Sequence, residues 1–306
     1  MKVDYLFIAS AYLAMSMATV SFAQSKHVFK IDSGYAKVNG TLLYYEVAGA
    51  GKTIVLIHGS FGDRRFWDFQ FKELSKKFKV VRYDIRGYGK SALPNADEVY
   101  KDCDDLNGLM DFLQIKKTHI CGLSLGSIIG IDFGLAHPEK CISLILCGPR
   151  VAGDGTDEYR TQNADTIRAI IAKTTEIAKN KGPMEATDYL WTGNHSMGKT
   201  IVSPTTRKKL IEMGYEYSWW RYRNASKREQ AFPMAIKKLN EIKIPTLVVT
   251  AQNDLELCKE VATIITNEIG NSKLVSITNA GHIMNMDNPK KFNKTISEFV
   301  AKSRLP

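Results

Sequence analysis

Gly122-Leu123-Ser124-Leu125-Gly126 lies between a predicted strand at 119–121 and a predicted helix at 127–137. In a G-x-S-x-G turn of this kind, the glycines let the chain pass sharply from strand to helix, which lifts the serine hydroxyl above the sheet edge. A hydroxyl displayed in this way is a candidate nucleophile, because a base and a substrate carbonyl can both reach it. The pentapeptide therefore predicts a strand–turn–helix unit with Ser124 at its corner.

Short buried strands and helices alternate on both sides of this turn. Strands are predicted at 53–57, 79–83, 142–146, 246–250 and 273–277, with helices near 71–74, 105–113 and 260–269 and after Pro289. Continuous apolar strands separated by helices are typical of a parallel sheet covered on both faces. An alternating segment at 28–47 with Asn39-Gly40 at its centre predicts an N-terminal hairpin. The sequence thus predicts an α/β fold with a mostly parallel central sheet and flanking helices.

The alternation stops after Pro149. From 150 to 243 the chain is polar and favours helices, has no convincing strand and holds three of the four tryptophans. We interpret this region as a helical insertion into a single α/β domain. The predicted organisation is a core formed by residues 24–149 and 244–306, interrupted by the insertion at 150–243.

A serine nucleophile needs a base, and the base needs an acid that orients it. With a turn of this kind the three follow in the order Ser, Asp or Glu, His. Asp254 follows the strand predicted at 246–250, and His282 follows the strand predicted at 273–277. Both therefore fall at the carboxyl edge of the sheet, as Ser124 does. We predict Ser124, Asp254 and His282 as catalytic residues, with Asp154 as the alternative acid.

Two backbone N–H groups are candidates for binding the oxyanion that forms during acyl transfer. One belongs to Leu125, directly after the nucleophile, and the other to Ser60, in the loop after the first buried strand. Glycines in this loop, 58–62, let its backbone pass close to a substrate. We expect His58 to hold the loop by hydrogen bonding and not to act as a base.

These motifs make the chain resemble the α/β-hydrolase fold superfamily over nearly all of the sequence after residue 23. The resemblance is carried by HGSFG at 58–62, DIRGYGKS at 84–91, GLSLG at 122–126, AHPE at 136–139, AQND at 251–254 and AGH at 280–282. It implies a capped serine hydrolase of carboxylesterase or lactonase type, in which the insertion covers the active site. Epoxide hydrolases and haloalkane dehalogenases of this superfamily use Asp as nucleophile, whereas this chain has Ser124.

The leading hypothesis is cleavage of a small carboxylic ester or lactone through an acyl-enzyme. Carbon–carbon bond hydrolysis uses the same nucleophile and base and is an alternative. A ligand-binding receptor with vestigial hydrolase activity and a lipase that meets anionic lipid through its basic cap are further alternatives. Aromatic side chains suggest an apolar substrate group, or else pack the cap onto the core. The candidates for contacting the substrate are Phe61, Trp191, Trp219 and Trp220.

Composition and charge narrow the possible partners. Of the 306 residues, 44% are hydrophobic and 24% charged, and the formal net charge is +10. No Cys/His cluster has metal-ligand spacing, so neither a metal nor a cofactor is predicted. The basic runs at 207–209 and 227–228 are interpreted as solvated surface and not as a nucleic-acid site. We expect a small-molecule, ester-like substrate as partner, and nothing in the sequence indicates an oligomeric state.

The N-terminal segment has the layout of a secretory signal peptide. Lys2 precedes an apolar run at 5–20, and Ser21-Phe22-Ala23 resembles a cleavage site. Cleavage after Ala23 would leave a periplasmic or secreted protein that meets the membrane only through this transient segment. An uncleaved membrane segment is the alternative. The odd number of cysteines, five, leaves at least one unpaired, and we predict no essential disulfide.

Overall fold

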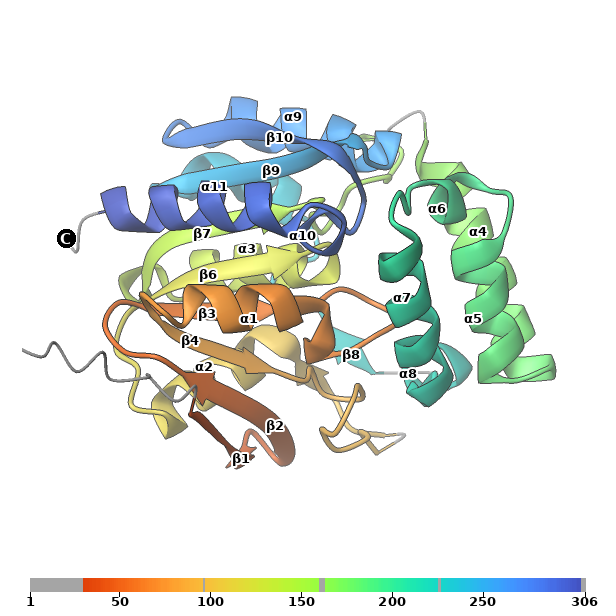
Figure 1. The fold of residues 1–306 in the computed structure, drawn as a ribbon, viewed down its shortest axis with the longest axis horizontal. Helices are drawn as coiled ribbons and strands as arrows, with labels where there is room; N and C mark the ends of the chain where they lie inside the picture. The colour runs from red at the N-terminus through yellow and green to blue at the C-terminus, as the bar shows by residue number, and fades with distance from the viewer. Residues whose placement is uncertain (1–29, 96, 160–162, 225–226, 304–306) are drawn as a thin grey trace, which may run out of the picture.

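The computed structural model describes residues 30–95, 97–159, 163–224 and 227–303. The predicted signal peptide at 1–23 lies outside these residues, so its cleavage and the export of the protein stay predictions. An eight-stranded sheet forms the centre of the described part, with helices on both faces and a further group of helices at one end (Figure 1). The predicted α/β fold with a mostly parallel sheet is confirmed.

The strands lie in the spatial order β1-β2-β4-β3-β6-β7-β9-β10. β2 pairs antiparallel with both β1 and β4, and all the other neighbouring strands are parallel. The strands of this sheet are β1 (Ile31–Val38), β2 (Thr41–Ala48), β3 (Thr53–Ile57), β4 (Lys79–Tyr83), β6 (Thr118–Leu123), β7 (Cys141–Cys147), β9 (Thr246–Asn253) and β10 (Ser272–Gly281).

Local sequence accounts for both kinds of pairing. The β1–β2 hairpin turns at Asn39 and Gly40, whose φ angles are 44° and 73°. Tight hairpin turns require positive φ at both central residues, which asparagine and glycine tolerate best. The central strands β6 and β7 are buried at every position, since helices cover them on both sides.

Two layers of helices sandwich the sheet (Figure 1). On one face α1 (Asp68–Leu74) packs against α11 (Pro289–Lys302). On the other face lie α2 (Asp102–Phe112), α3 (Leu125–Ala136) and α9 (Glu256–Glu268). The short helical turns are η1 (Arg64–Trp67), η2 (Pro138–Lys140), η3 (Ala235–Glu241) and α10 (Met284–Asp287), none of which the sequence pattern predicts as a separate element. The helices and strands hold apolar side chains in one continuous buried core.

The inserted helical region stands at one end of the sheet, beyond the carboxyl ends of its parallel strands (Figure 1). It consists of α4 (Ala164–Asn180), α5 (Pro183–Thr192), α6 (Ser196–Lys199), α7 (Pro204–Glu216) and α8 (Trp220–Arg223). We call these helices the cap. Among the described residues, no helix combines the length and apolar character needed to cross a bilayer.

One expectation about the region 150–243 is wrong in detail, because the region contains a strand. β8 (Arg228–Glu229) pairs in parallel with β5 (Tyr100–Lys101) in a separate two-stranded sheet. A strand of two residues gives no periodic signal in the sequence. It forms here beside a buried ion pair between Arg228 and Asp102, two groups 126 residues apart in the chain.

Candidate active site

Ser124 occupies a strained turn between β6 and α3. Its φ of 51° and ψ of −105° lie outside the regions that ordinary residues favour. A Cβ on Gly122 would lie 2.1 Å from the carbonyl oxygen of Gly126, and one on Gly126 would lie 2.3 Å from that of Ile57. Both distances are too short for any side chain, so the turn requires glycine at each end of G-x-S-x-G. The chain therefore holds the Ser124 backbone in a conformation that costs about 1–3 kcal/mol when it is not supported by its surroundings.

The predicted base and acid meet at the ends of two adjacent strands. β9 and β10 are parallel, and after a register shift between Ile277 and Gly281 they pair Gly281 with Asn253, so the next residues, His282 and Asp254, emerge side by side. His282 Nδ1 lies 2.7 Å from Asp254 Oδ1, and both side chains are buried. Because a carboxylate only accepts hydrogen bonds, Nδ1 carries the proton and Nε2 keeps a free lone pair. This tautomer is the one that a general base requires.

The alternative acid, Asp154, is engaged elsewhere. Its two oxygens accept hydrogen bonds from Nε and Nη2 of Arg150, each at 2.6 Å. Asp154 is therefore paired with Arg150, and of the two candidate acids it is Asp254 that contacts the imidazole of His282.

The predicted oxyanion donors flank Ser124. Leu125 is the first residue of α3, and the leading N–H groups of a helix have no intrahelical acceptor. Ser60 lines the same cavity as Ser124. The next residue, Phe61, has a φ of 68°, a left-handed conformation that turns the loop sharply at this point. The N–H groups of Ser60 and Leu125 thus stay the predicted oxyanion donors.

His58 holds this loop from behind, as its sequence context predicts. The N–H of Ile85 donates to His58 Nε2 at 3.0 Å, and His58 Nδ1 lies 2.7 Å from the carbonyl oxygen of Gly59. Nε2 is therefore the acceptor, and Nδ1–H donates to Gly59. Burial lowers the pKa of His58 to about 4, so the ring is neutral at pH 7. The neutral ring is hydrogen-bonded at both nitrogens, so it positions the loop and has no free lone pair with which to act as a base.

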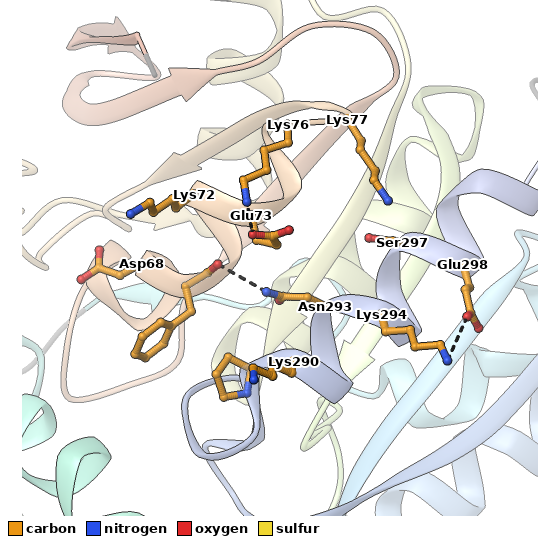
Figure 2. Close-up of a pocket in the computed structure, with 12 residues that line it drawn as sticks. Asp68, Lys72, Glu73, Lys76, Lys77, Lys290, Asn293, Lys294, Ser297 and Glu298 are labelled. Atoms are coloured by element: carbon orange, nitrogen blue, oxygen red, sulfur yellow. Dashed lines mark hydrogen bonds and ion pairs between the residues drawn. The ribbon is translucent and has the colours of Figure 1, made fainter. Parts of the chain in front are cut away.

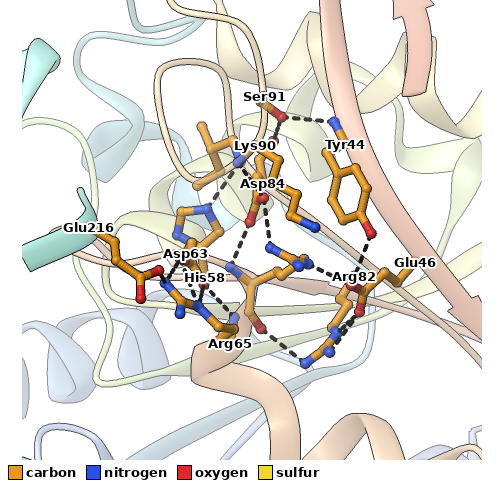
Figure 3. Close-up of polar contacts among 12 residues, drawn as sticks. Tyr44, Glu46, His58, Asp63, Arg65, Arg82, Asp84, Lys90, Ser91 and Glu216 are labelled. Carbon is orange, nitrogen blue, oxygen red and sulfur yellow. Dashed lines mark hydrogen bonds and ion pairs between the residues drawn. The ribbon is translucent and has the colours of Figure 1, made fainter. Parts of the chain in front are cut away.

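A network of charged side chains supports the same loop (Figure 3). Asp84 accepts a hydrogen bond from the backbone N–H of Arg64 at 2.8 Å and another from its Nη1 at 3.0 Å. Glu46 bridges the guanidinium groups of Arg64 and Arg82. Burial raises the pKa of Asp84 to about 6, against the lowering effect of Arg64. The network ties the start of η1 to β2 and β4, and so fixes the loop between His58 and Arg64.

We expect protonation of His58 to destabilise the fold in acid. Its pKa is about 4 in the folded protein and about 6.5 when unfolded, so between these pH values only the unfolded chain gains the proton. The free energy of unfolding is therefore unaffected by protonation of His58 above pH 6.5 and falls by up to about 3 kcal/mol as the pH drops toward 4. Urea unfolding gives the free energy of unfolding of wild type and His58→Asn from pH 7.5 to 4.5. The contribution of His58 is the difference between the two slopes of this free energy against pH. Parallel slopes, or an NMR titration of the ring near pH 6.5, would show that the assignment is wrong.

A small cavity joins these groups. Its volume is about 160 Å³, and it lies between the sheet edge and the cap. Most of its walls are apolar, and Ser124 and His282 face it together. The lining residues are Gly59, Ser60, Phe61, Phe66, Leu123, Ser124, Arg150, Ile167, Ile171, Trp191, Met197, Tyr222, Leu255, Cys258, His282 and Ile283.

The four predicted aromatic contacts fall into two groups. Phe61 and Trp191 line the cavity. Trp219 and Trp220 are not among the described residues that line it. Trp219 is fully buried, packs on Phe61 at a ring distance of 5.3 Å, and donates from Nε1 to the carbonyl oxygen of Gly214 at 3.2 Å. It supports the wall from behind. Tyr222, not singled out from the sequence, stacks on Phe61 at 4.6 Å and lines the cavity itself.

Cys258 is a further neighbour that spacing in the sequence does not reveal. Ligand atoms of Asp254, Cys258 and His282 lie within 4.8 Å of one another, and all three residues are buried. Burial raises the pKa of the Cys258 thiol, which disfavours the thiolate that metals bind. Nδ1 of His282 is already committed to Asp254. The cluster therefore fits an acid–base pair beside an apolar thiol better than a metal site.

A larger groove lies on the outer surface between α1 and α11, away from these groups (Figure 2). Its volume is about 980 Å³, and its rim carries five lysines, Lys72, Lys76, Lys77, Lys290 and Lys294. Lys76 pairs with Glu73 at 2.5 Å, and Lys294 lies 3.9 Å from Glu298. None of the predicted catalytic residues is among those that line it. We interpret the groove as solvated surface.

The fold and this site together define a class of protein. A serine on a strained strand-to-helix turn, followed in sequence by a buried Asp–His pair at the same sheet edge, is the arrangement of α/β-fold hydrolases. The chain belongs to the alpha/beta hydrolase fold family, whose model matches residues 52–289.

Proteins similar to the chain carry the names of several kinds of hydrolase. The putative carbamate hydrolase RutD of Azorhizobium caulinodans is 23% identical over 266 residues, which cover 87% of this chain and 97% of that protein. An enol-lactonase structure from Burkholderia xenovorans LB400 has a TM-score of 0.70 at 25% identity, covering 88% of this chain and 100% of that one. An esterase structure from Thermogutta terrifontis has a TM-score of 0.73 at 24% identity, covering 90% and 100%. The 2-hydroxy-6-oxo-6-phenylhexa-2,4-dienoate hydrolase of Comamonas testosteroni is 22% identical over 269 residues, which cover 85% of this chain and 91% of that protein.

Proposed function

We propose that this protein is a serine hydrolase that cleaves small carboxylic esters or lactones. One observation carries the proposal. Ser124 and His282 line a single cavity, while Asp254 holds the imidazole through a 2.7 Å hydrogen bond. A nucleophile, a base with a free lone pair and a buried orienting acid are the three parts that acyl transfer to serine requires.

In the proposed reaction Ser124 Oγ attacks the substrate carbonyl carbon while His282 Nε2 takes the hydroxyl proton. The developing oxyanion accepts hydrogen bonds from the N–H groups of Ser60 and Leu125, each worth about 3 kcal/mol of transition-state stabilisation. The alkoxide leaves with the proton from His282. Water, deprotonated by His282, then attacks the acyl carbon, and the acid departs as the proton returns to Ser124.

The size of the cavity supports a small substrate group. A cavity of roughly 150 Å³ lined by apolar side chains accepts a benzene ring, and the cavity here measures about 160 Å³. Trp191 and Phe61 form part of its wall, and both are buried. A short aliphatic or single-ring acyl group fits this space, whereas a long fatty acyl chain does not.

Hydrolysis of p-nitrophenyl esters from acetate to octanoate tests the proposal. We expect turnover of the short esters and a fall of about tenfold or more in kcat/KM beyond four to six acyl carbons, because each misfitting methylene costs about 1–3 kcal/mol. Trp191→Leu opens the wall and moves the preference toward longer chains. Trp220→Leu, outside the wall, is the matched control and keeps the wild-type preference.

Other results of this experiment point elsewhere. Folded wild-type protein that hydrolyses none of the esters contradicts the ester assignment. It would favour carbon–carbon bond hydrolysis, or ligand binding without turnover. A preference for the longest chains would contradict the size argument.

A further inference from the structure

Arg150 brings a positive charge into this cavity. It follows β7 and is the only permanently charged side chain among the described residues that line the cavity with Ser124 and His282. Of its side-chain surface 27% is exposed, against 6% for its partner Asp154. Part of the Arg150 side chain therefore lines the open space of the cavity, while the carboxylate that pairs with it is nearly covered.

Asp154 occupies only one edge of the guanidinium. Nε and Nη2 of Arg150 donate to its two oxygens at 2.6 Å each. A guanidinium has five N–H donors, so both hydrogens of Nη1 and one of Nη2 are left over. Within the described part of the chain, Nη1 makes no hydrogen bond, and it is not a fully buried atom. The free edge, Nη1 with Nη2, has the fork geometry that binds a carboxylate.

The same molecule shows that one arginine can hold two carboxylates in this way. Arg86 donates from Nε and Nη2 to Asp105, at 2.9 and 2.6 Å, and from Nη1 to Glu98 at 2.5 Å. Asp105 thus binds the same two nitrogens of Arg86, Nε and Nη2, that Asp154 binds on Arg150. At Arg150 no residue of the described chain takes the place of Glu98, and Arg150 itself lines the cavity.

Ser127 fixes Arg150 relative to the nucleophile. Ser127 Oγ accepts a hydrogen bond from the backbone N–H of Arg150 at 2.8 Å. The same oxygen lies 2.6 Å from the carbonyl oxygen of Ser124 and 2.9 Å from that of Arg150. One hydroxyl therefore links the backbone of the strained turn to the backbone of Arg150, which sets the separation between the attacking oxygen and the guanidinium.

We propose that Arg150 binds a carboxylate on the substrate, so that the enzyme acts on short esters or lactones whose acyl part carries a second, free carboxylate. This inference rests on the proposed function and names its substrate class. The free edge of Arg150 holds the carboxylate while Ser124 attacks the ester carbonyl at the other end. Because the cavity is small, only a few carbons can separate the free carboxylate from the ester carbonyl of the substrate.

Two substrates of nearly equal length test the inference, p-nitrophenyl butyrate and p-nitrophenyl hydrogen succinate. Wild type is expected to prefer the hemisuccinate. Arg150→Gln removes the charge and the fork of N–H groups and leaves a shorter, neutral polar side chain. It is expected to lower the ratio of kcat/KM for the hemisuccinate to kcat/KM for the neutral butyrate about 10- to 100-fold. Succinate should inhibit wild type competitively and lose this effect in Arg150→Gln.

Controls separate the possible failures. Arg168→Gln, on the outer surface of α4, removes a surface arginine paired with Asp165 and should change neither substrate. If Arg150→Gln lowers kcat/KM for both substrates equally, or if wild type shows no preference for the hemisuccinate, the carboxylate site is overturned while the serine hydrolase proposal stands. If wild type turns over neither ester, or if Ser124→Ala leaves turnover intact, the proposed function itself fails. Thermal unfolding of each variant confirms that the comparison is made on folded protein.

Discussion

Ser124→Ala is expected to lower kcat/KM for a short ester by about 10⁵-fold, the scale seen when one member of a catalytic triad is removed. The reason is that no other hydroxyl stands on the turn between β6 and α3 facing His282. Stability should change by less than about 1 kcal/mol, since only one oxygen is lost and the backbone keeps its strained conformation. Steady-state kinetics and urea unfolding of the same preparation measure both quantities.

Ser297→Ala is the matched control, because this serine lies on α11 far from the cavity. It should leave both activity and stability unchanged. A Ser124→Ala variant that keeps more than a few per cent of wild-type activity, freed of contaminating esterase, would remove Ser124 from the reaction. A variant that unfolds would leave the activity loss ambiguous, and Ser124→Gly, which tolerates positive φ, then replaces it.

Asp102→Asn is expected to destabilise the protein by about 3–5 kcal/mol, because it removes the charge that faces the buried side chain of Arg221 and the partly buried side chain of Arg228. Asp102 lies at the start of α2 and is 3% exposed. It accepts hydrogen bonds from Arg221 at 3.1 Å and from Arg228, both of which follow the long helices of the cap. Burial by itself raises the pKa of Asp102, but the two guanidinium groups lower it to about 2. The charge therefore persists at all physiological pH values and holds the end of the cap to the core.

Urea unfolding measures the loss, with Asp104→Asn as control, since Asp104 is exposed on the same helix. KM should rise as well, because α8 carries Tyr222 into the cavity wall. Adding Arg221→Met to Asp102→Asn should recover part of the stability, as one uncompensated cation is then gone. Equal stability of Asp102→Asn and Asp104→Asn would show that the ion pairs do not hold the cap.

The position of the predicted catalytic residues follows from local sequence. Gly122 and Gly126 are required because a Cβ on either would lie 2.1 or 2.3 Å from a backbone oxygen. The same steric requirement makes this type of turn recognisable in a sequence. Asp254 and His282 each follow a buried strand. Since parallel strands end at the same edge of a sheet, the sequence pattern already brings these two residues near Ser124.

The walls of the cavity did not follow from the sequence in the same way. Trp191 and Trp219 are both buried aromatic residues of one insertion, yet Trp191 lines the cavity and Trp219 packs behind Phe61. Hydrophobicity reports burial and not which surface a ring faces. That depends on how the cap helices pack against a loop more than 100 residues earlier, which periodicity does not reveal.

Arg150 and Asp102 show the same limit for charged groups. Arg150 follows β7 as Asp254 follows β9, so its position in the sequence already indicates the carboxyl edge of the sheet. A search for nucleophiles and bases does not consider an arginine at this position. Asp102 and its partners Arg221 and Arg228 are separated by 119 and 126 residues. A single sequence carries no sign that these charges meet, and the strand β8 that accompanies them is too short to have a pattern.

Covalent trapping of the nucleophile tests the central claim most directly. Incubation with a fluorophosphonate, followed by intact-mass measurement and peptide mapping, reports which side chain forms a bond to an electrophile that mimics the tetrahedral intermediate. We predict one adduct per chain, on Ser124 in the turn between β6 and α3, with loss of esterase activity in proportion to labelling. An adduct on another residue, or full activity after stoichiometric labelling of Ser124, would contradict the assignment of Ser124 as the nucleophile.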